Sequence, residues 1–194
     1  EVDKHMMDGG TYRYRRYGQF DKPKSIKKLS LLPHEAYTQP SYINSLNGDI
    51  SRQFEPLTLP FVSSPVLTKL LLWMSDVYDA ALGEAQDWNI RLHPYRIISS
   101  AEQIGKPTPE GLHRDGVTFI ASMLIDRVNI TGGKTTITDN QQSLLTQTTL
   151  MQPFDLMLAN DELTMHDVSP LVSKQAEQPA YRDVLVIAFT KKDS

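Results

Sequence analysis

Cysteine is absent from this sequence of 194 residues. Its absence excludes disulfide bonds, zinc–thiolate centres, iron–sulfur clusters and a cysteine nucleophile. It also favours a reducing, cytoplasmic compartment. No apolar run approaches the roughly 18 residues of a membrane-spanning helix, so we expect no membrane association. Internal repeats and low-complexity segments are also missing, which argues against a repeat architecture.

An excess of positive charge is lacking as well. The formal net charge is −3 and the pI is near 6.0, which argues against a nucleic-acid partner. Residues 1–28 are a local exception, with eight Lys/Arg against four Asp/Glu. Within them, Tyr12-Arg13-Tyr14-Arg15 interleaves aromatic and basic side chains, as single-strand nucleic-acid surfaces do. The alternation more simply predicts a half-exposed strand at a charged sheet edge.

One helix is clearly indicated in the first half of the chain. Ser64 and Pro65 are favoured residues for the N-cap and the first helical position, and Gly83 is a favoured C-cap. Between them, apolar residues recur with the three- and four-residue spacing of one buried helix face. The sequence therefore predicts an amphipathic helix over about 65–82.

From Trp88 onward the pattern changes to short β-favouring runs separated by turn signals. Hydrophobic residues make up 40% of the chain, enough for the core of a single domain. Helices followed by many short strands predict a mainly β (α+β) fold, a sandwich or jelly roll buttressed by N-terminal helices. We expect one domain over 1–194, with a helical and edge-strand part at 1–87 and a jelly-roll core at 88–190.

Three residues have the types and spacing of a catalytic metal site. His113 and Asp115 form a His-x-Asp pair, and side chains two residues apart in an extended segment point the same way. His166 follows 51 residues later, where a neighbouring strand could bring it alongside. Two imidazoles and one carboxylate on one face of an octahedron are typical of non-haem iron(II) oxygenases, which keep the other face open.

A co-substrate with a carboxylate needs a planar, two-pronged donor, which arginine provides and lysine does not. Arg182 begins an apolar strand 16 residues after His166, in a position to meet a molecule chelated to the iron. Gly132 and Gly133 do not form a phosphate loop, because the required earlier glycine is replaced by Val128. They predict a turn, and Thr135 after them could face either a strand neighbour or the co-substrate.

The surroundings of these residues resemble one family. The relevant segments are Pro107-Thr-Pro-Glu-Gly-Leu-His113-Arg-Asp115-Gly, Ile130-Thr-Gly-Gly133, His166-Asp-Val-Ser-Pro-Leu171 and Tyr181-Arg182-Asp-Val-Leu-Val-Ile-Ala-Phe189. Together they resemble the bacterial 2-oxoglutarate/Fe(II)-dependent dioxygenases that include isoleucine dioxygenase and related free L-amino-acid hydroxylases. The resemblance covers residues 88–190, and less closely 12–20 and 52–54.

The resemblance implies a double-stranded β-helix with His113, Asp115 and His166 as Fe(II) ligands and Arg182 as the salt-bridge partner of 2-oxoglutarate. It implies hydroxylation or sulfoxidation of an aliphatic amino acid such as isoleucine, leucine or methionine, with O₂ as oxidant and succinate as co-product. A His-x-x-Arg similar to the family's ends at Arg96, which could hold a substrate carboxylate or brace the site, and Tyr95 could face the pocket or solvent.

Two other functions use a similar architecture. A cupin-like metal enzyme without oxygenase activity would share the fold and the metal but would have no need for Arg182. A jelly-roll binding module without catalysis would have no need for a complete set of ligands. The sequence carries no indication of oligomeric state.

Overall fold

The protein is described here by a computed structural model, which covers residues 2–6, 8–39 and 50–192. Its helices are α1 (Leu59–Val62) and α2 (Pro65–Leu82). Its strands are β1 (Arg13–Lys22), β2 (Ser30–Leu31), β3 (Glu55–Pro56), β4 (Trp88–Ile98), β5 (Phe119–Val128), β6 (Ile130–Gly132), β7 (Lys134–Asp139), β8 (Leu144–Thr149), β9 (Leu156–Asn160), β10 (Thr164–Val168), β11 (Leu171–Ser173) and β12 (Tyr181–Lys191). The mainly β fold class is confirmed.

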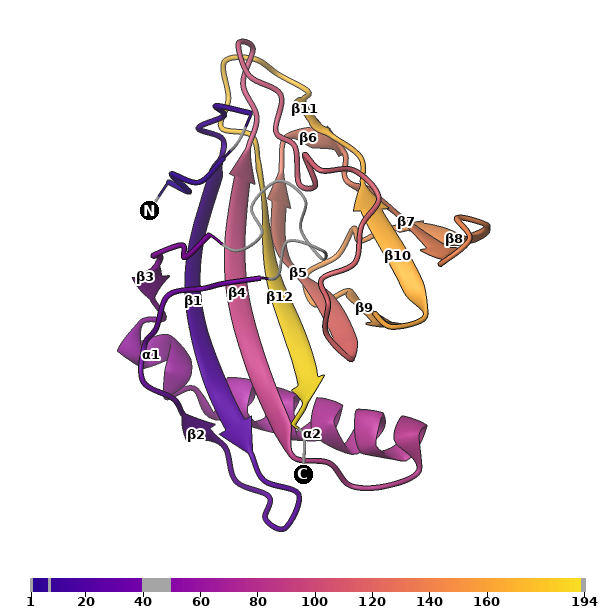
Figure 1. The fold of residues 1–194 in the computed structure, drawn as a ribbon. Coiled ribbons are helices and arrows are strands. Elements are labelled where there is room, and N and C mark those ends of the chain that lie inside the picture. Colours follow the sequence, from indigo (N-terminus) through magenta and orange to yellow (C-terminus); the bar gives the residue numbers. More distant parts are fainter. Residues whose placement is uncertain (1, 7, 40–49, 193–194) are drawn as a thin grey trace.

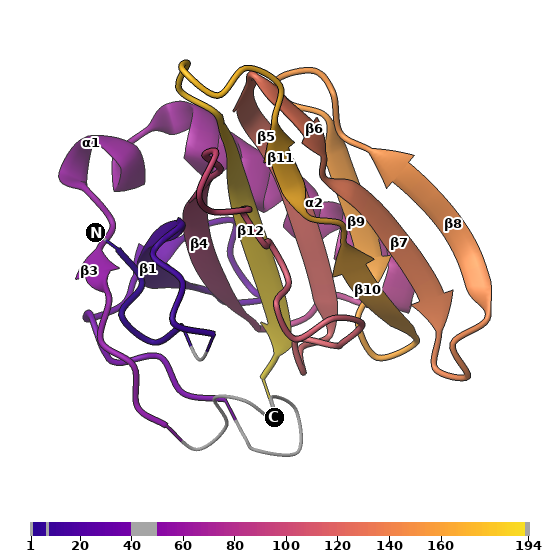
Figure 2. The same cartoon turned by 90° about the horizontal axis from the view of Figure 1, so that it is seen from above.

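The strands form one large sheet and two small ones. The large sheet has the order β2-β1-β4-β12-β5-β9, with β3 paired to β1. A three-stranded sheet β10-β7-β8 and a two-stranded sheet β11-β6 complete the fold. Figure 1 shows the long strands β1, β4 and β12 side by side, and Figure 2 shows β10, β7 and β8 forming a second layer. This arrangement of mostly antiparallel sheets is the expected jelly roll.

Helix α2 has the predicted ends and the predicted buried face. Ser64 Oγ accepts a hydrogen bond from the backbone N–H of Leu67 at 3.4 Å, and Gly83 ends the helix with a left-handed φ of 79°. The helix packs against one face of the large sheet, with Leu71 and Met74 fully buried. No helix among the described residues is both long and apolar enough to cross a membrane.

Side-chain alternation divides the large sheet into two chemically different faces. The residues of β4, β5 and β12 that pack with α2 are Trp88, Ile90, Leu92, Phe119, Ala121, Met123, Leu185, Ile187 and Phe189. Because successive side chains of a strand point to opposite faces, the residues between them face the interior of the jelly roll. This interior face carries buried polar side chains such as His93 and Arg182 together with small apolar clusters. The largest hydrophobic cluster lies between the sheet and α2.

The strand predicted at Tyr12–Arg15 is present as the start of β1, but the prediction that it is a solvated edge is wrong. Strand β1 is hydrogen-bonded to β4 on one side and to β2 and β3 on the other. Arg13 and Arg15 are only 7% and 4% exposed, because they lie on the interior face, where the buried carboxylate of Asp3 pairs with Arg13 at 2.9 Å. The N-terminal part therefore contributes strand β1 to the main sheet.

Truncation of the helix face should destabilise the fold. Leu71→Ala should lower the free energy of unfolding by about 2–5 kcal/mol, because the fully buried side chain would leave a cavity against the sheet. Leu59→Ala is the matched control, because Leu59 is 76% exposed and its change should stay within about 0.5 kcal/mol. Urea unfolding of both variants measures this, and equal losses would contradict the packing.

Candidate metal and co-substrate site

Two backbone hydrogen bonds bring His113 and His166 together. His113 lies in the connection between β4 and β5, and His166 lies in β10. The N–H of His113 donates to the carbonyl of His166 at 3.0 Å, and the N–H of His166 donates to the carbonyl of His113 at 2.8 Å. The connection therefore lies beside β10 like a further antiparallel strand. Because His113 and His166 are directly opposite each other, their imidazoles project from the same face of this pair.

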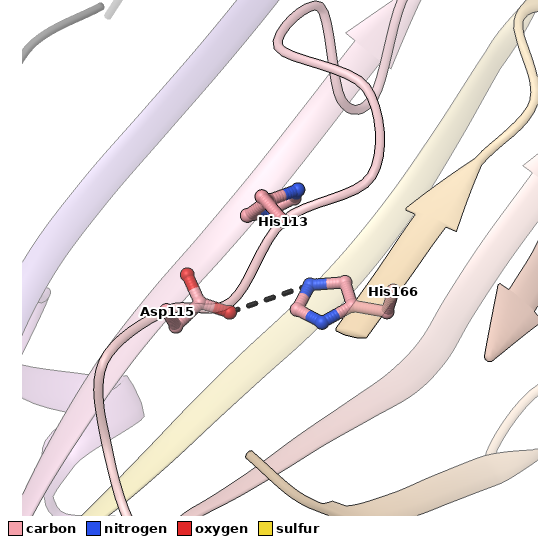
Figure 3. A group of neighbouring side chains, drawn as sticks. All are labelled: His113, Asp115 and His166. Atoms are coloured by element: carbon pink, nitrogen blue, oxygen red, sulfur yellow. Dashed lines mark ion pairs between the residues drawn. The ribbon is translucent and has the colours of Figure 1, made fainter. Parts of the chain in front are cut away.

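The structure brings the three predicted residues into one cluster (Figure 3). One nitrogen or oxygen atom from each of His113, Asp115 and His166 lies within 4.8 Å of the other two. The Nε2 of His166 lies 3.4 Å from the Oδ2 of Asp115, and the imidazole centroids are 4.4 Å apart. These distances are short enough for one metal ion to contact all three.

The tautomer of His113 also suits a metal. Its Nδ1–H donates to the carbonyl of Gly111 at 2.7 Å, which leaves Nε2 as the nitrogen available to a ligand. Burial alone would lower the pKa of His113, but the carboxylates of Asp115 and Glu110 outweigh burial and raise it. Burial lowers the pKa of His166, which favours its neutral form. A bound cation would take the place of a proton among these groups.

Arg182 lines the same cavity as the cluster, from β12. Its side chain is 2% exposed, and no described residue accepts a hydrogen bond from its Nε–H or one of its terminal nitrogens. Burial, and after it the charge of Arg127, lowers the pKa of Arg182 to about 10, so the guanidinium stays charged at neutral pH. Burying a charged arginine without a counter-ion costs desolvation free energy, which the binding of an anion would offset. Thr135 of β7, 2% exposed, lines the same cavity.

Comparison with known proteins identifies the family. Residues 1–188 match the family model described as 2OG-Fe dioxygenase. The chain belongs to this family. It is therefore an oxidoreductase, and the family uses Fe(II), 2-oxoglutarate and O₂.

Individual relatives agree with this family. The chain is 27% identical over 186 residues to a 3(1)-hydroxy-L-isoleucine 4-dioxygenase of Pantoea ananatis, covering 93% of this chain and 74% of that protein. A bsmA homologue from Methylobium petroleophilum is 36% identical, with a TM-score of 0.89 over 98% of this chain and 76% of the other. IDO from Bacillus thuringiensis shares the fold at 20% identity, with a TM-score of 0.79 over 99% of this chain and 82% of the other.

The cluster and its cavity fit the cofactors of a 2OG-Fe dioxygenase. Two imidazoles and one carboxylate are the donor set that non-haem iron(II) favours, and no further described His, Cys, Asp or Glu belongs to the group. The unpaired nitrogens of Arg182 suit one carboxylate of a dicarboxylic co-substrate. The three-residue cluster and Arg182 line the same cavity, so a co-substrate that chelates the metal could also reach the arginine.

Of the two predicted substrate residues, Tyr95 lines the dioxygenase cavity and Arg96 does not. Arg96 follows Tyr95 on β4 and so projects from the opposite face. There it donates to both carboxylate oxygens of Asp183 at 2.7 and 2.6 Å and lies over the ring of Tyr181. Its position does not support a role in holding a substrate inside this cavity.

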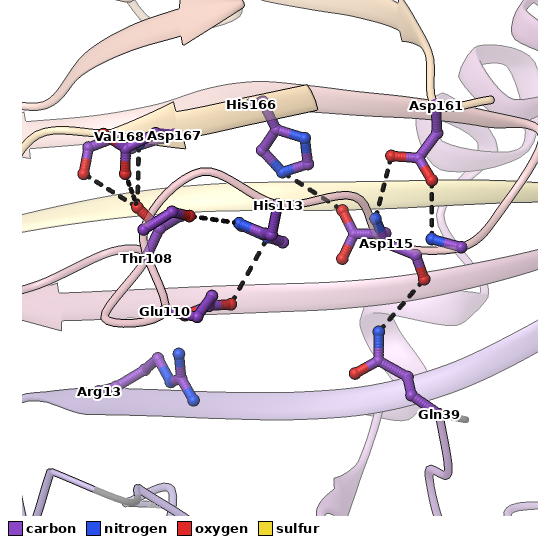
Figure 4. A network of polar contacts seen from close by, with 12 residues as sticks. Arg13, Gln39, Thr108, Glu110, His113, Asp115, Asp161, His166, Asp167 and Val168 are labelled. Carbon is purple, nitrogen blue, oxygen red and sulfur yellow. Dashed lines mark hydrogen bonds and ion pairs between the residues drawn. The ribbon is translucent and has the colours of Figure 1, made fainter. Parts of the chain in front are cut away.

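Sequence reasoning missed Asp161, which positions Asp115 (Figure 4). Asp161 is 1% exposed, and its carboxylate accepts hydrogen bonds from the backbone N–H groups of Asp115, Gly116 and Val117 at 3.0, 2.7 and 3.0 Å. Burial, followed by the charge of Asp115, raises the pKa of Asp161. In the sequence, Asp161 appears only as part of a turn signal after β9.

Thr108 fixes the other end of the same connection. Its hydroxyl donates to Oδ1 of Asp167 at 2.6 Å and accepts from the backbone N–H of Val168 at 3.0 Å. Both partners follow His166 directly along β10, as Figure 4 shows. The connection that carries His113 and Asp115 is thus attached to β10 before the metal residues and, through Asp161, to the β9–β10 turn after them.

Asp161→Asn should weaken metal binding without removing a ligand. An amide offers one acceptor oxygen in place of two, so Asp115 loses part of its support, and a loss of roughly 10–100-fold in metal affinity is expected. Calorimetric titration of the metal-free protein with Mn(II) or Co(II) measures this. Asp155→Asn is the matched control, because Asp155 accepts N–H groups from Met151 and Gln152 in a turn outside the cluster. Equal affinities for both variants would contradict the positioning role.

Proposed function

We propose that this dioxygenase hydroxylates or sulfoxidises a free aliphatic L-amino acid such as isoleucine, leucine or methionine, and converts 2-oxoglutarate to succinate and CO₂. The observation that carries the proposal is the buried, unpaired Arg182 in the same cavity as His113, Asp115 and His166. The choice of an amino acid rests on the relative from Pantoea ananatis, a dioxygenase of 3(1)-hydroxy-L-isoleucine. The cytoplasmic location favoured by the lack of cysteine is part of this proposal.

In this proposal His113, Asp115 and His166 hold Fe(II) on one face. The opposite face is left for 2-oxoglutarate and O₂, as a site with three protein ligands allows. Bound iron would supply the activation of O₂ and the oxidation of a C–H bond, a chemistry that no protein side chain provides. The protein's part is to hold the carboxylate of Asp115 and the neutral imidazoles in place.

Arg182 would bind the distal carboxylate of 2-oxoglutarate through its unpaired nitrogens. The ion pair would satisfy the buried cation, and the planar guanidinium would fix the direction of the co-substrate. Thr135 lines the same cavity, and in this proposal its hydroxyl would donate to the same molecule. Because Arg182 lies in the main sheet, this end of the co-substrate would be held by a rigid element.

The rest of the cavity wall suits an aliphatic substrate and a reactive oxidant. Its apolar members come from β4, β5, β9, β10 and β12, and they are Ile97, Ile120, Met157, Val168, Val184 and Val186. Such a wall excludes water from the reaction and offers few groups that would be oxidised in place of the substrate. Met157 is the exception, because its thioether is open to oxidation.

A direct screen tests the function. Purified protein is supplied with Fe(II), ascorbate, 2-oxoglutarate and each free amino acid, and succinate is measured together with a mass increase of one oxygen atom in the amino acid. The expected result is succinate formation that depends on an aliphatic amino acid. Succinate that never exceeds the rate without substrate, with no oxygenated amino acid, would refute the proposal.

Removal of either ligand from the His-x-Asp pair should abolish turnover. His113→Ala or Asp115→Ala leaves two protein ligands, too few to retain iron, so product should fall to background. Arg114→Ala is the control, because Arg114 lies between them and its guanidinium donates to the carbonyl of Glu162, at 3.4 Å. Near-normal turnover by both ligand variants would contradict the assignment.

Arg182→Lys should weaken 2-oxoglutarate binding much more than metal binding. One ammonium replaces a planar fork, so the dissociation constant for 2-oxoglutarate should rise by roughly tenfold or more, as expected when a charged hydrogen bond is lost. Titration of the Mn(II)-loaded protein measures it. Arg96→Lys is the matched control, because Arg96 lies on the face of the sheet opposite to the cavity and the same change there should leave 2-oxoglutarate binding unaffected. An unchanged affinity in Arg182→Lys would remove Arg182 as the anchor.

A further inference from the structure

Asp115 borders two cavities, one on each side. The first contains Arg182. The second is lined by Arg15, Tyr37, Gln39, Arg52, Arg91, His93, Tyr95, Asp115, Val117, Ile120, Val186 and Ala188. The two share Tyr95, Asp115, Ile120 and Val186, so they meet at the candidate metal site. A molecule in the second cavity would therefore approach the same metal from a different side.

The second cavity, called here the arginine chamber, contains more buried positive charge than its acidic groups neutralise. Arg15 and Arg52 are 4% and 2% exposed, and the Nε atom of each has no hydrogen-bond partner among the described residues. Asp3 is 3.7 Å from Arg15 but pairs more closely with Arg13, at 2.9 Å. Asp3 does not line the cavity, and the one acidic residue in its described lining is Asp115, which the proposed iron would engage.

The remaining contacts of the two arginines are with neutral groups. Arg15 donates to Nδ1 of His93 at 2.7 Å, and burial, followed by the charge of Arg15, keeps the pKa of His93 well below its ordinary value. Arg52 donates to the amide oxygen of Gln39 at 2.8 Å. Neither neutral partner compensates a buried charge, so both guanidiniums are left without a full counter-ion.

The two guanidinium groups lie over the faces of aromatic rings. The central carbon of Arg15 lies 3.8 Å from the ring centre of Phe54, and that of Arg52 lies 4.9 Å from the ring centre of Tyr37. Cation–π contacts of this kind stabilise the charge and leave the N–H edges available. Two buried guanidiniums with free N–H groups beside the metal site are a receptor for a carboxylate.

We propose that the arginine chamber binds the free α-carboxylate of the substrate, with Arg52 and Arg15 as its partners. This inference rests on the proposed function and assigns the residues that would recognise its free amino-acid substrate. A carboxylate held here must be ionised and unblocked, so residues within a peptide and amino-acid amides are excluded. The side chain of the bound amino acid would extend toward Asp115 and the metal, while Arg182 holds 2-oxoglutarate in the first cavity.

Equilibrium binding tests the inference without turnover. Protein loaded with Zn(II) and 2-oxoglutarate is titrated calorimetrically with L-isoleucine, L-leucine and L-methionine and with their carboxamides. At least one of the three acids should bind, and its carboxamide should bind at least roughly tenfold more weakly, because a charged hydrogen bond is lost. Equal binding of acid and carboxamide, or no binding of any acid, would overturn the inference.

Variants identify the residues. Arg52→Gln and Arg15→Gln should each weaken binding of the acid by roughly tenfold or more, with 2-oxoglutarate affinity unchanged, and Arg52→Lys should restore part of the loss. Arg96→Gln, on the outer face, should bind as the wild type does. Full affinity in both glutamine variants, or a loss confined to 2-oxoglutarate, would refute the assignment. If a variant does not fold, as circular dichroism would show, the acid and carboxamide comparison on wild-type protein decides.

The two proposals fail in different ways. If the acids bind through Arg52 but no amino acid is oxygenated, the arginine chamber is correct and the proposed reaction is wrong. If an amino acid is oxygenated and its carboxamide is bound and oxygenated equally well, the reaction is correct and the arginine chamber is not the carboxylate site.

Discussion

The site depends on the reciprocal backbone hydrogen bonds between His113 and His166. They attach a connection without regular structure to β10, and by doing so they place residues far apart in the sequence within reach of one cation. Thr108 and Asp161 secure the two ends of the same segment. The geometry of the three candidate ligands is thus fixed by main-chain hydrogen bonds and by the side chains that support them. In this way a loop can hold side chains as accurately as a strand does.

The large sheet combines two functions that its two faces keep separate. One face is apolar and packs with α2, which supplies most of the hydrophobic stabilisation. The other face carries Arg15 and Arg182, and Arg52 of the segment before β3 is buried in the cavity beside Arg15. The three arginines have few acidic partners, so their burial has a cost in desolvation. Burial of the apolar face offsets that cost, so the fold can retain arginines whose nitrogens are free to bind anions. The unpaired nitrogens are the physical basis of both proposals, one for the co-substrate and one for the substrate.

The arrangement of the arginines also suggests how selectivity arises. Arg182 and the pair Arg15 and Arg52 lie in separate cavities that meet at Asp115. A dicarboxylate and an amino acid can then approach one metal from different sides without competing for the same cation. Apolar residues such as Ile120 and Val186 line both cavities and would face the aliphatic part of the substrate. In the two proposals the arginines would orient the ligands, and the apolar wall would keep water away from the reaction.

Sequence alone determined the features that depend on local chemistry: the capped helix, the run of short strands from Trp88 onward, and the residue types of the cluster with Arg182. It did not determine which face of each strand would be interior, because alternation defines two faces without saying which is buried. Arg96 therefore received a role that its position does not support, while Arg15 was interpreted as part of a solvated edge. Asp161 was missed, because its hydrogen bonds join segments about 45 residues apart. Only the packing of β1 beside β4, and of the metal-bearing connection beside β10, decided which charges lie inside.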